Sequence, residues 1–142
     1  MAVLAFAALT ACSKKEKVSG GDVTTSAAVP APAAAAVAVA DIDVGKSVAD
    51  AKVTDKTNEF KAADTVYASV HTTGAAPAAT VMARWTFEDG QVVNESSRSI
   101  APTGDAYTEF HISKPTGLPK GKYKVEVFLD TKSVGTKDFE VK

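Results

Sequence analysis

The stretch of sequence that decides the fold runs Val81-Met82-Ala83-Arg84-Trp85-Thr86-Phe87-Glu88-Asp89-Gly90-Gln91-Val92-Val93. As far as Glu88, one set of apolar side chains alternates with a second set that is mostly polar. This period-two pattern is typical of a strand with one buried face. Asp89-Gly90 follows directly and suits the positive φ angles of a tight hairpin turn, after which Val92 and Val93 begin a second strand. The stretch therefore predicts an antiparallel β-hairpin with Trp85 on its buried face.

The same alternation recurs at short intervals along the chain. Further strands are expected around residues 66–71, 107–112 and 122–129, with a last strand ending at Val141 and an earlier one near Val48–Thr54. No stretch shows the 3.6-residue periodicity of an amphipathic helix. About seven short strands separated by turns predict an all-β fold, specifically an antiparallel β-sandwich.

A second informative run is Leu118-Pro119-Lys120-Gly121-Lys122-Tyr123-Lys124-Val125-Glu126-Val127. It resembles the start of the sixth strand in fibronectin III-like and other immunoglobulin-like domains, and Trp85 falls on the third strand, where such domains place a core tryptophan. The resemblance implies an immunoglobulin-like sandwich and a tyrosine corner, in which the Tyr123 hydroxyl bonds nearby backbone. The core is expected to contain Trp85, Phe110, Tyr123 and Val125. Aliphatic residues occupy the inward positions where antibody domains carry their disulfide, so that bond is not expected.

The N-terminus carries Leu9-Thr10-Ala11-Cys12, which closes an apolar run and contains the only cysteine. The run is about ten residues long, too short to span a bilayer but typical of a signal peptide. The motif resembles the lipobox of small bacterial lipoproteins. The resemblance implies cleavage between Ala11 and Cys12, a lipid such as palmitate on Cys12, and, from Ser13, sorting to the outer membrane, facing the periplasm. No Lys or Arg precedes the apolar run, so we expect the first residues of the signal peptide to be missing.

Composition divides the chain into three parts. Residues 1–11 are expected to be the signal peptide, residues 12–42 the lipidated cysteine and a flexible linker rich in Ala, Pro and Ser, and residues 43–142 the β-sandwich. Pro30 and Pro32 interrupt the Ala-rich part of the linker and favour extended conformations over helix. This organisation predicts a folded module tethered to a membrane.

The charge balance and the motifs exclude several function classes. The 142 residues carry 16 basic and 17 acidic side chains, whereas a nucleic-acid binder normally concentrates basic charge on one face. No Ser or Thr lies in a recognisable nucleophile elbow, and the sequence has neither a Gly-rich phosphate loop nor an HExxH-type metal motif. We therefore expect no enzymatic activity, no cofactor, no metal and no nucleic-acid partner.

The candidate binding face combines residues from two strands that are neighbours in an immunoglobulin-like sheet. It consists of Tyr67, His71, Tyr107, Glu109 and His111. Tyrosines offer a large amphipathic contact area, so these outward positions could bind a protein, a peptide or a glycan. A zinc site built on the two histidines would need two more ligands. Ordinary cross-strand pairing on a half-exposed sheet explains the same residues and is the simpler interpretation.

The leading functional hypothesis is a lipid-anchored envelope protein whose β-sandwich is a non-enzymatic protein-interaction or assembly module, with an envelope protein as partner. One alternative is a glycan- or peptide-binding module. A second alternative is an inhibitor of an envelope protease that would insert the loop Thr72–Ala79. The sequence leaves the oligomeric state open.

Overall fold

The computed structural model describes residues 36–142, which contain strands, turns and loops and no helix. The strands are β1 (Ala38–Gly45), β2 (Val48–Ala49), β3 (Lys52–Val53), β4 (Glu59–Phe60), β5 (Val66–Thr73), β6 (Ala79–Phe87), β7 (Val92–Ile100), β8 (Ala106–Ile112), β9 (Gly121–Leu129) and β10 (Lys132–Val141). The hairpin that was predicted around Asp89-Gly90 is β6–β7, and Gly90 has a φ of +84° in its turn.

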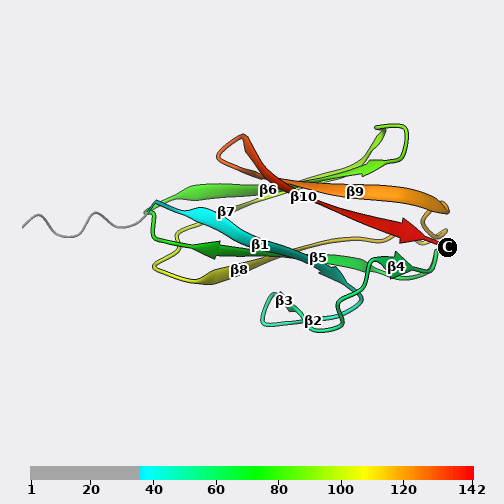
Figure 1. The fold of residues 1–142 in the computed structure, drawn as a ribbon, viewed down its shortest axis with the longest axis horizontal. Helices are drawn as coiled ribbons and strands as arrows, with labels where there is room; N and C mark the ends of the chain where they lie inside the picture. The colour runs from blue at the N-terminus through cyan, green and yellow to red at the C-terminus, as the bar shows by residue number, and fades with distance from the viewer. Residues whose placement is uncertain (1–35) are drawn as a thin grey trace, which may run out of the picture. The chain divides into compact units, whose positions relative to one another are not determined.

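Two sheets pack face to face (Figure 1). One has the strand order β1-β5-β8, and the other has the order β4-β10-β9-β6-β7. Every pairing in them is antiparallel except that of the short β4, which runs parallel to the end of β10. The seven long strands thus form an all-β sandwich, as the alternation predicted.

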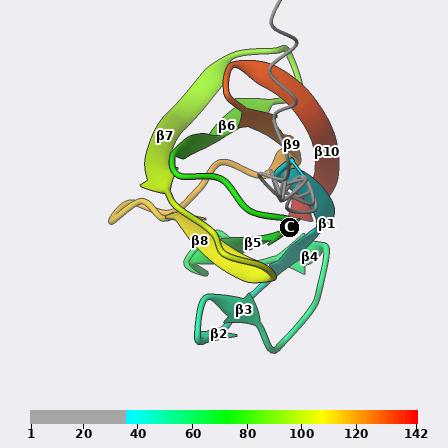
Figure 2. The same ribbon diagram turned by 90° about the vertical axis from the view of Figure 1, so that its left-hand side faces the viewer.

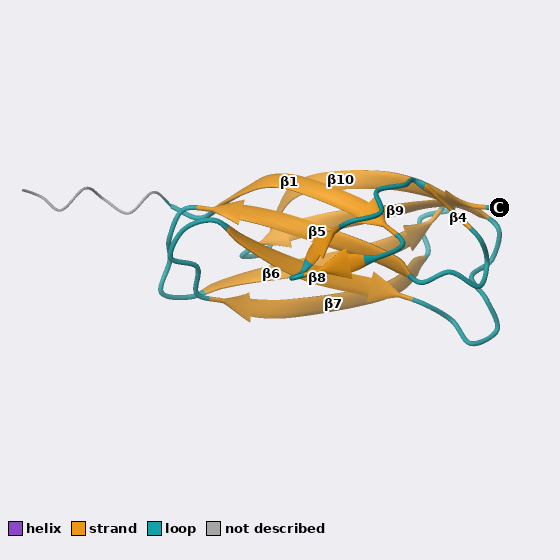
Figure 3. Ribbon diagram, turned by 90° about the horizontal axis from the view of Figure 1, so that it is seen from below, coloured by secondary structure: helices purple, strands orange, loops and turns teal. Residues whose placement is uncertain are grey.

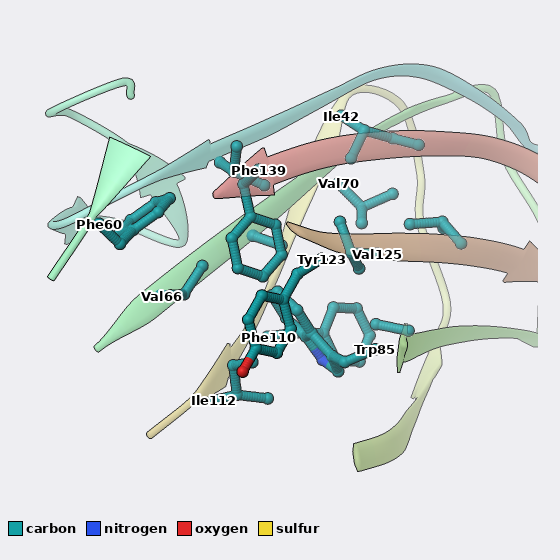
Figure 4. Packing of buried hydrophobic residues seen from close by; sticks show 14 of the residues in the cluster. Ile42, Phe60, Val66, Val70, Trp85, Phe110, Ile112, Tyr123, Val125 and Phe139 are labelled. Carbon is teal, nitrogen blue, oxygen red and sulfur yellow. The ribbon is translucent and has the colours of Figure 1, made fainter. Parts of the chain in front are cut away.

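The core lies between the sheets and is built around aromatic rings (Figure 4). The four residues expected there, Trp85, Phe110, Tyr123 and Val125, are all buried. Phe139 of β10 lies among these rings, with its centroid 5.8 Å from that of Trp85 and 5.2 Å from that of Tyr123. Because aromatic side chains bury large apolar areas, this cluster contributes much of the stabilisation of the sandwich.

Tyr123 also satisfies its one polar atom inside the core. Its hydroxyl donates a hydrogen bond of 2.8 Å to the carbonyl of Pro119. This is the tyrosine corner that the run of residues 118–127 implied. Burial, together with the charge of Glu88, raises the pKa of the Tyr123 hydroxyl, so it remains a protonated donor.

Two boundaries differ from the prediction. β1 begins at Ala38, so the folded part starts before residue 43, and residues 38–42 are strand rather than linker. Their Ala-rich sequence lacks alternation. They form a strand because their backbone N–H and C=O groups pair with those of β5. Val48–Thr54 is also no single strand. Asp50 and Ala51 have φ of 49° and 61°, so the segment folds back as the small β2–β3 hairpin.

The residues expected to form the signal peptide, including Ala11, and the lipidation site Cys12 lie outside the described residues, as does most of the predicted linker. Within residues 36–142, no helix is long and apolar enough to cross a membrane.

Candidate functional site

The pairing of β5 with β8 brings all five residues of the candidate face onto one side of the sheet. Tyr67 lies opposite His111, Ser69 opposite Glu109, and His71 opposite Tyr107. Directly opposed residues of an antiparallel pair project from the same face, and here that is the face directed away from the core. The register therefore agrees with the neighbouring positions expected from the sequence.

The five side chains form two groups. At one end, the Tyr67 and His111 rings are 5.6 Å apart, and a 2.6 Å hydrogen bond joins His111 Nδ1 to Glu109 Oε1. At the other end, His71 and Tyr107 stack with centroids 4.6 Å apart and planes 10° from parallel. The two ring contacts are cross-strand pairs of the kind that stabilise a half-exposed sheet, whereas the Glu109–His111 bond lies within β8.

The β2–β3 hairpin lies on the outer side of the sheet that contains β5 and β8 (Figures 1 and 2). Ser69, between them, is only 2% exposed, and its hydroxyl donates a hydrogen bond of 2.8 Å to the carbonyl of Ala51 at the hairpin turn. Lys52 places its ammonium group 5.3 Å from the centre of the Tyr107 ring. The outward positions of β5 and β8 therefore do not form one open surface, because the turn of the β2–β3 hairpin covers Ser69 between the two groups.

The histidines do not assemble a metal site. His71 Nε2 is buried without a hydrogen-bond partner among the described residues, and its nearest carboxylate oxygen, on Asp105, is 3.9 Å away. No group of three or more His, Cys, Asp or Glu side chains in residues 36–142 is arranged to hold a metal ion. Zinc binding would need further ligands that this face does not bring together.

Two residues of the candidate face, Tyr107 and Glu109, also line a groove at the side of the sandwich where both sheets end. β7 ends one sheet and β8 ends the other, and among the described strands neither has a partner on its outer edge (Figures 2 and 3). A groove of about 350 Å³ runs between them, and we call it the seam groove. It is lined by Ala51, Arg98, Ser99, Ile100, Tyr107, Thr108 and Glu109.

Arg98 spans the seam groove from β7 to β8. It lies opposite Val81, so it belongs to the face of β7 that is turned toward the other sheet, and it is exposed at the open side of the sandwich beside β8. Its Nε donates a hydrogen bond of 3.0 Å to the Glu109 carbonyl, and its guanidinium lies 5.8 Å from the centre of the Phe110 ring. The guanidinium is thus held in place by one polar and one aromatic contact.

Sequence reasoning missed Arg98, Ser99 and Ile100. It located the start of β7 from Val92 and Val93, but the rest of that strand, Asn94-Glu95-Ser96-Ser97-Arg98-Ser99, lacks apolar alternation. That lack is itself a usable signal, because an edge strand with no sheet opposite it buries neither face. A polar strand directly after a strongly alternating one could have marked this edge.

A larger hollow of about 430 Å³ lies beside β4 and the end of β10, away from the candidate face. Of its charged residues, Glu59 accepts a hydrogen bond from Lys142, and Glu140 lies opposite Lys122 on the adjacent strand. The seam groove is the better candidate, because it is lined by Tyr107 and Glu109 of the candidate face and this hollow by none of that face.

No family model and no curated protein matches this chain. Among solved structures, an immunoglobulin-like protein from Pseudomonas aeruginosa is similar, with a TM-score of 0.51 and 17% identity over 78% of this chain and 99% of that one. The Pseudomonas fluorescens alkylpurine DNA glycosylase AlkC, solved with DNA containing an abasic site analogue, has a TM-score of 0.50 and 17% identity over 75% of this chain, which spans only 30% of the glycosylase. The first likeness confirms an immunoglobulin-like fold.

Proposed function

We propose that this chain is a lipid-anchored bacterial envelope protein whose immunoglobulin-like domain is a non-enzymatic protein-interaction module, and that it binds its partner at the seam groove. One observation carries the proposal: the edges of β7 and β8, which no other strand of residues 36–142 pairs with, lie side by side with a groove between them. An unpaired edge presents a row of N–H and C=O groups, and an extended segment of another protein can add to it as a further strand.

The geometry favours a peptide over a glycan at this site. Sugar rings bind on the open face of an aromatic side chain, but the Tyr107 ring stacks on His71 and is also approached by Lys52. Main-chain groups along a strand edge suit main-chain groups of a peptide instead.

The loop proposed for protease inhibition has fewer features to support it. Ala76 donates its amide hydrogen to the carbonyl of Pro102, and Ala75 forms a bridge with Thr103, so the loop is tied to the segment between β7 and β8. Because the loop is held in this way, it closes one end of the sandwich and does not protrude for insertion into a protease. We therefore favour the seam groove as the interaction site.

The anchor part of the proposal rests on the lipobox-like residues Leu9 to Cys12. More than one acyl chain at Cys12 would hold the protein at a membrane far more firmly than the marginal binding of a single chain. Cys12→Ser should abolish labelling with radioactive palmitate and release the protein from the membrane fraction. Continued labelling would contradict the assignment of Cys12.

The interaction is tested by photo-crosslinking in living cells. A photoreactive amino acid at Ser99 lies in the seam groove. One at Lys124, which is exposed on β9 of the same sheet and does not line the groove, is the matched control. We expect one discrete crosslinked envelope protein from Ser99 and none from Lys124. Equal crosslinking from both positions, or none from Ser99, would show that the seam groove is not the binding site.

A further inference from the structure

The chain has two arginines, and they differ in how their charge is matched. Arg84, on the outer face of β6, donates from Nε to Glu95 Oε2 at 2.7 Å and lies 4.9 Å from the centre of the Phe128 ring. Arg98 has the same kind of aromatic contact, with Phe110, but no carboxylate of residues 36–142 lies within ion-pair distance of it. Arg98 is therefore a positioned cation that lacks a charge partner within the described domain.

The groups around Arg98 leave one side of its guanidinium available. Its Nε is occupied by the Glu109 carbonyl, whereas its terminal amino groups make no hydrogen bond to a described residue. The Glu109 carboxylate does not serve as a counter-ion, because it projects from the outer face and bonds His111 Nδ1 at 2.6 Å. A guanidinium fixed at Nε can still offer its terminal N–H groups to a carboxylate.

We propose that the seam groove binds an extended acidic segment of a partner protein, with a Glu or Asp carboxylate of that segment bound by Arg98. The inference rests on the proposed function and names the chemistry of the partner. The segment pairs its main chain with an exposed strand edge, and the carboxylate fixes its register against Arg98. Charge-assisted hydrogen bonds of this kind are about twice as strong as neutral ones, so they select an acidic segment among strand-forming ones.

A second copy of this chain is the other natural occupant of a strand edge, and its charges do not fit. Glu95 lies opposite Arg84 on the outer face, whereas Arg98 lies opposite Val81 and is directed inward. Two copies could pair their β7 strands across a two-fold axis to form one continuous antiparallel sheet. In such a sheet, residues that lie opposite each other project from the same face. Glu95 of a second copy therefore does not meet Arg98 when two β7 strands pair in this way, and the inward positions of β7 (Asn94, Ser96, Arg98 and Ile100) include no acidic residue. A partner that brings its own acidic residue fits Arg98 better.

The experiment uses the full-length chain in a mild non-ionic detergent and two fluorescent, end-capped probe peptides, Ser-Thr-Val-Glu-Val-Thr-Ser and the same peptide with Gln in place of Glu. Affinities are measured by fluorescence polarisation at low and high salt. We expect the Glu peptide to bind about tenfold or more tightly than the Gln peptide, as a charge-assisted hydrogen bond allows, with the difference shrinking in high salt.

Arg98→Met keeps an apolar side chain over Phe110 and should remove the preference for Glu, while Arg98→Lys, which keeps the charge without the planar fork, should retain part of it. The matched control is Arg84→Met, which should leave both affinities unchanged. Thermal unfolding of each variant verifies that the domain is folded.

Equal affinities for the two peptides, a preference that survives Arg98→Met, or no binding of either peptide would overturn the acidic-segment inference. Self-association of the chain that blocks both peptides would assign the groove to a second copy and overturn it as well. If Ser99 still crosslinks to one envelope protein in cells, only the partner chemistry is wrong. If that crosslink is also absent, the proposed function itself fails.

Discussion

The hydroxyl of Tyr123 and the carbonyl of Pro119, four residues earlier, are joined by a hydrogen bond of 2.8 Å at the start of β9. The bond lets a tyrosine lie in the core without an unsatisfied polar atom, and it fixes the path of the chain as it enters the strand.

Tyr123→Phe removes the donor and leaves the Pro119 carbonyl without its partner, while the ring still packs against Phe139. We expect a loss of about 1–2 kcal/mol in the free energy of unfolding, measured by urea denaturation. An unchanged m-value would show that the fold is retained. A loss of less than a few tenths of a kcal/mol would contradict a structural role for the corner.

Trp85→Ala should cost about 3–5 kcal/mol, because it opens a large cavity in the centre of the core. Trp85→Phe is the informative companion, since Trp85 Nε1 is buried with no hydrogen-bond partner among the described residues. Replacing the indole by a phenyl ring loses volume but no hydrogen bond, so it should cost clearly less than the alanine change. A cost below about 1 kcal/mol for Trp85→Ala would show that the ring is not in the core.

Gly45→Val tests how the β2–β3 hairpin is held against the sheet. A β-carbon at Gly45 would lie only 2.1 Å from the carbonyl oxygen of Asp55, so the returning chain must move. We expect a loss of about 1–3 kcal/mol and faster hydrogen exchange at the Thr54 amide, which bonds the Ser47 carbonyl in the hairpin.

The control for Gly45→Val is Gly90→Ala. Nothing lies within 4 Å of a β-carbon at Gly90. The loss of stability in Gly90→Ala therefore comes only from the positive φ of +84°. That variant should leave exchange in the hairpin unchanged. Equal exchange at Thr54 in both variants would mean that Gly45 is not needed for the close approach.

The stability of the domain should fall in acid partly through Asp64. Its carboxylate accepts a hydrogen bond from the Lys61 amide and lies 3.2 Å from the Lys46 ammonium, and these contacts lower the pKa of Asp64 from the ordinary value of 3.8. A carboxyl with a lowered folded-state pKa stabilises the fold above pH 3.8, and this contribution disappears as the pH falls through the lower value.

Asp64→Asn should therefore reduce stability at pH 7 and have little effect near pH 2. Urea unfolding of both proteins across this pH range measures the difference in their free energies of unfolding. We expect a small difference, because the carboxylate is partly exposed and solvent screens its charge. A difference that stays constant between pH 7 and pH 2 would show that the charge of Asp64 is not the cause.

Much of the sandwich was predictable because alternation reports burial residue by residue. Val81 to Phe87 and Tyr123 to Val127 follow the pattern closely. Their apolar residues are buried as expected, except that Phe87 is only half-buried. The turn at Gly90 was equally local, since its positive φ is one that glycine adopts without a steric penalty. The error at Ala38–Ile42 has the opposite origin: a strand held by backbone pairing needs no apolar pattern of its own.

The candidate site was predictable only in part. The opposition of His71 and Tyr107 followed from the expected strand order, but the β2–β3 hairpin that covers Ser69 depends on residues 18 positions away in the chain. Arg98 was not predicted, because its position beside β8 depends on which strands lie at the edges of the two sheets.

The sequence by itself determined most of the strands, which of their residues face the core and where the turn after β6 lies, because those properties depend on neighbouring side chains. Only the tertiary structure decided which strands became edges, how the hairpin divides the candidate face and which cation lacks a carboxylate. These features depend on the distances between segments far apart in the chain, and local alternation carries no information about those distances.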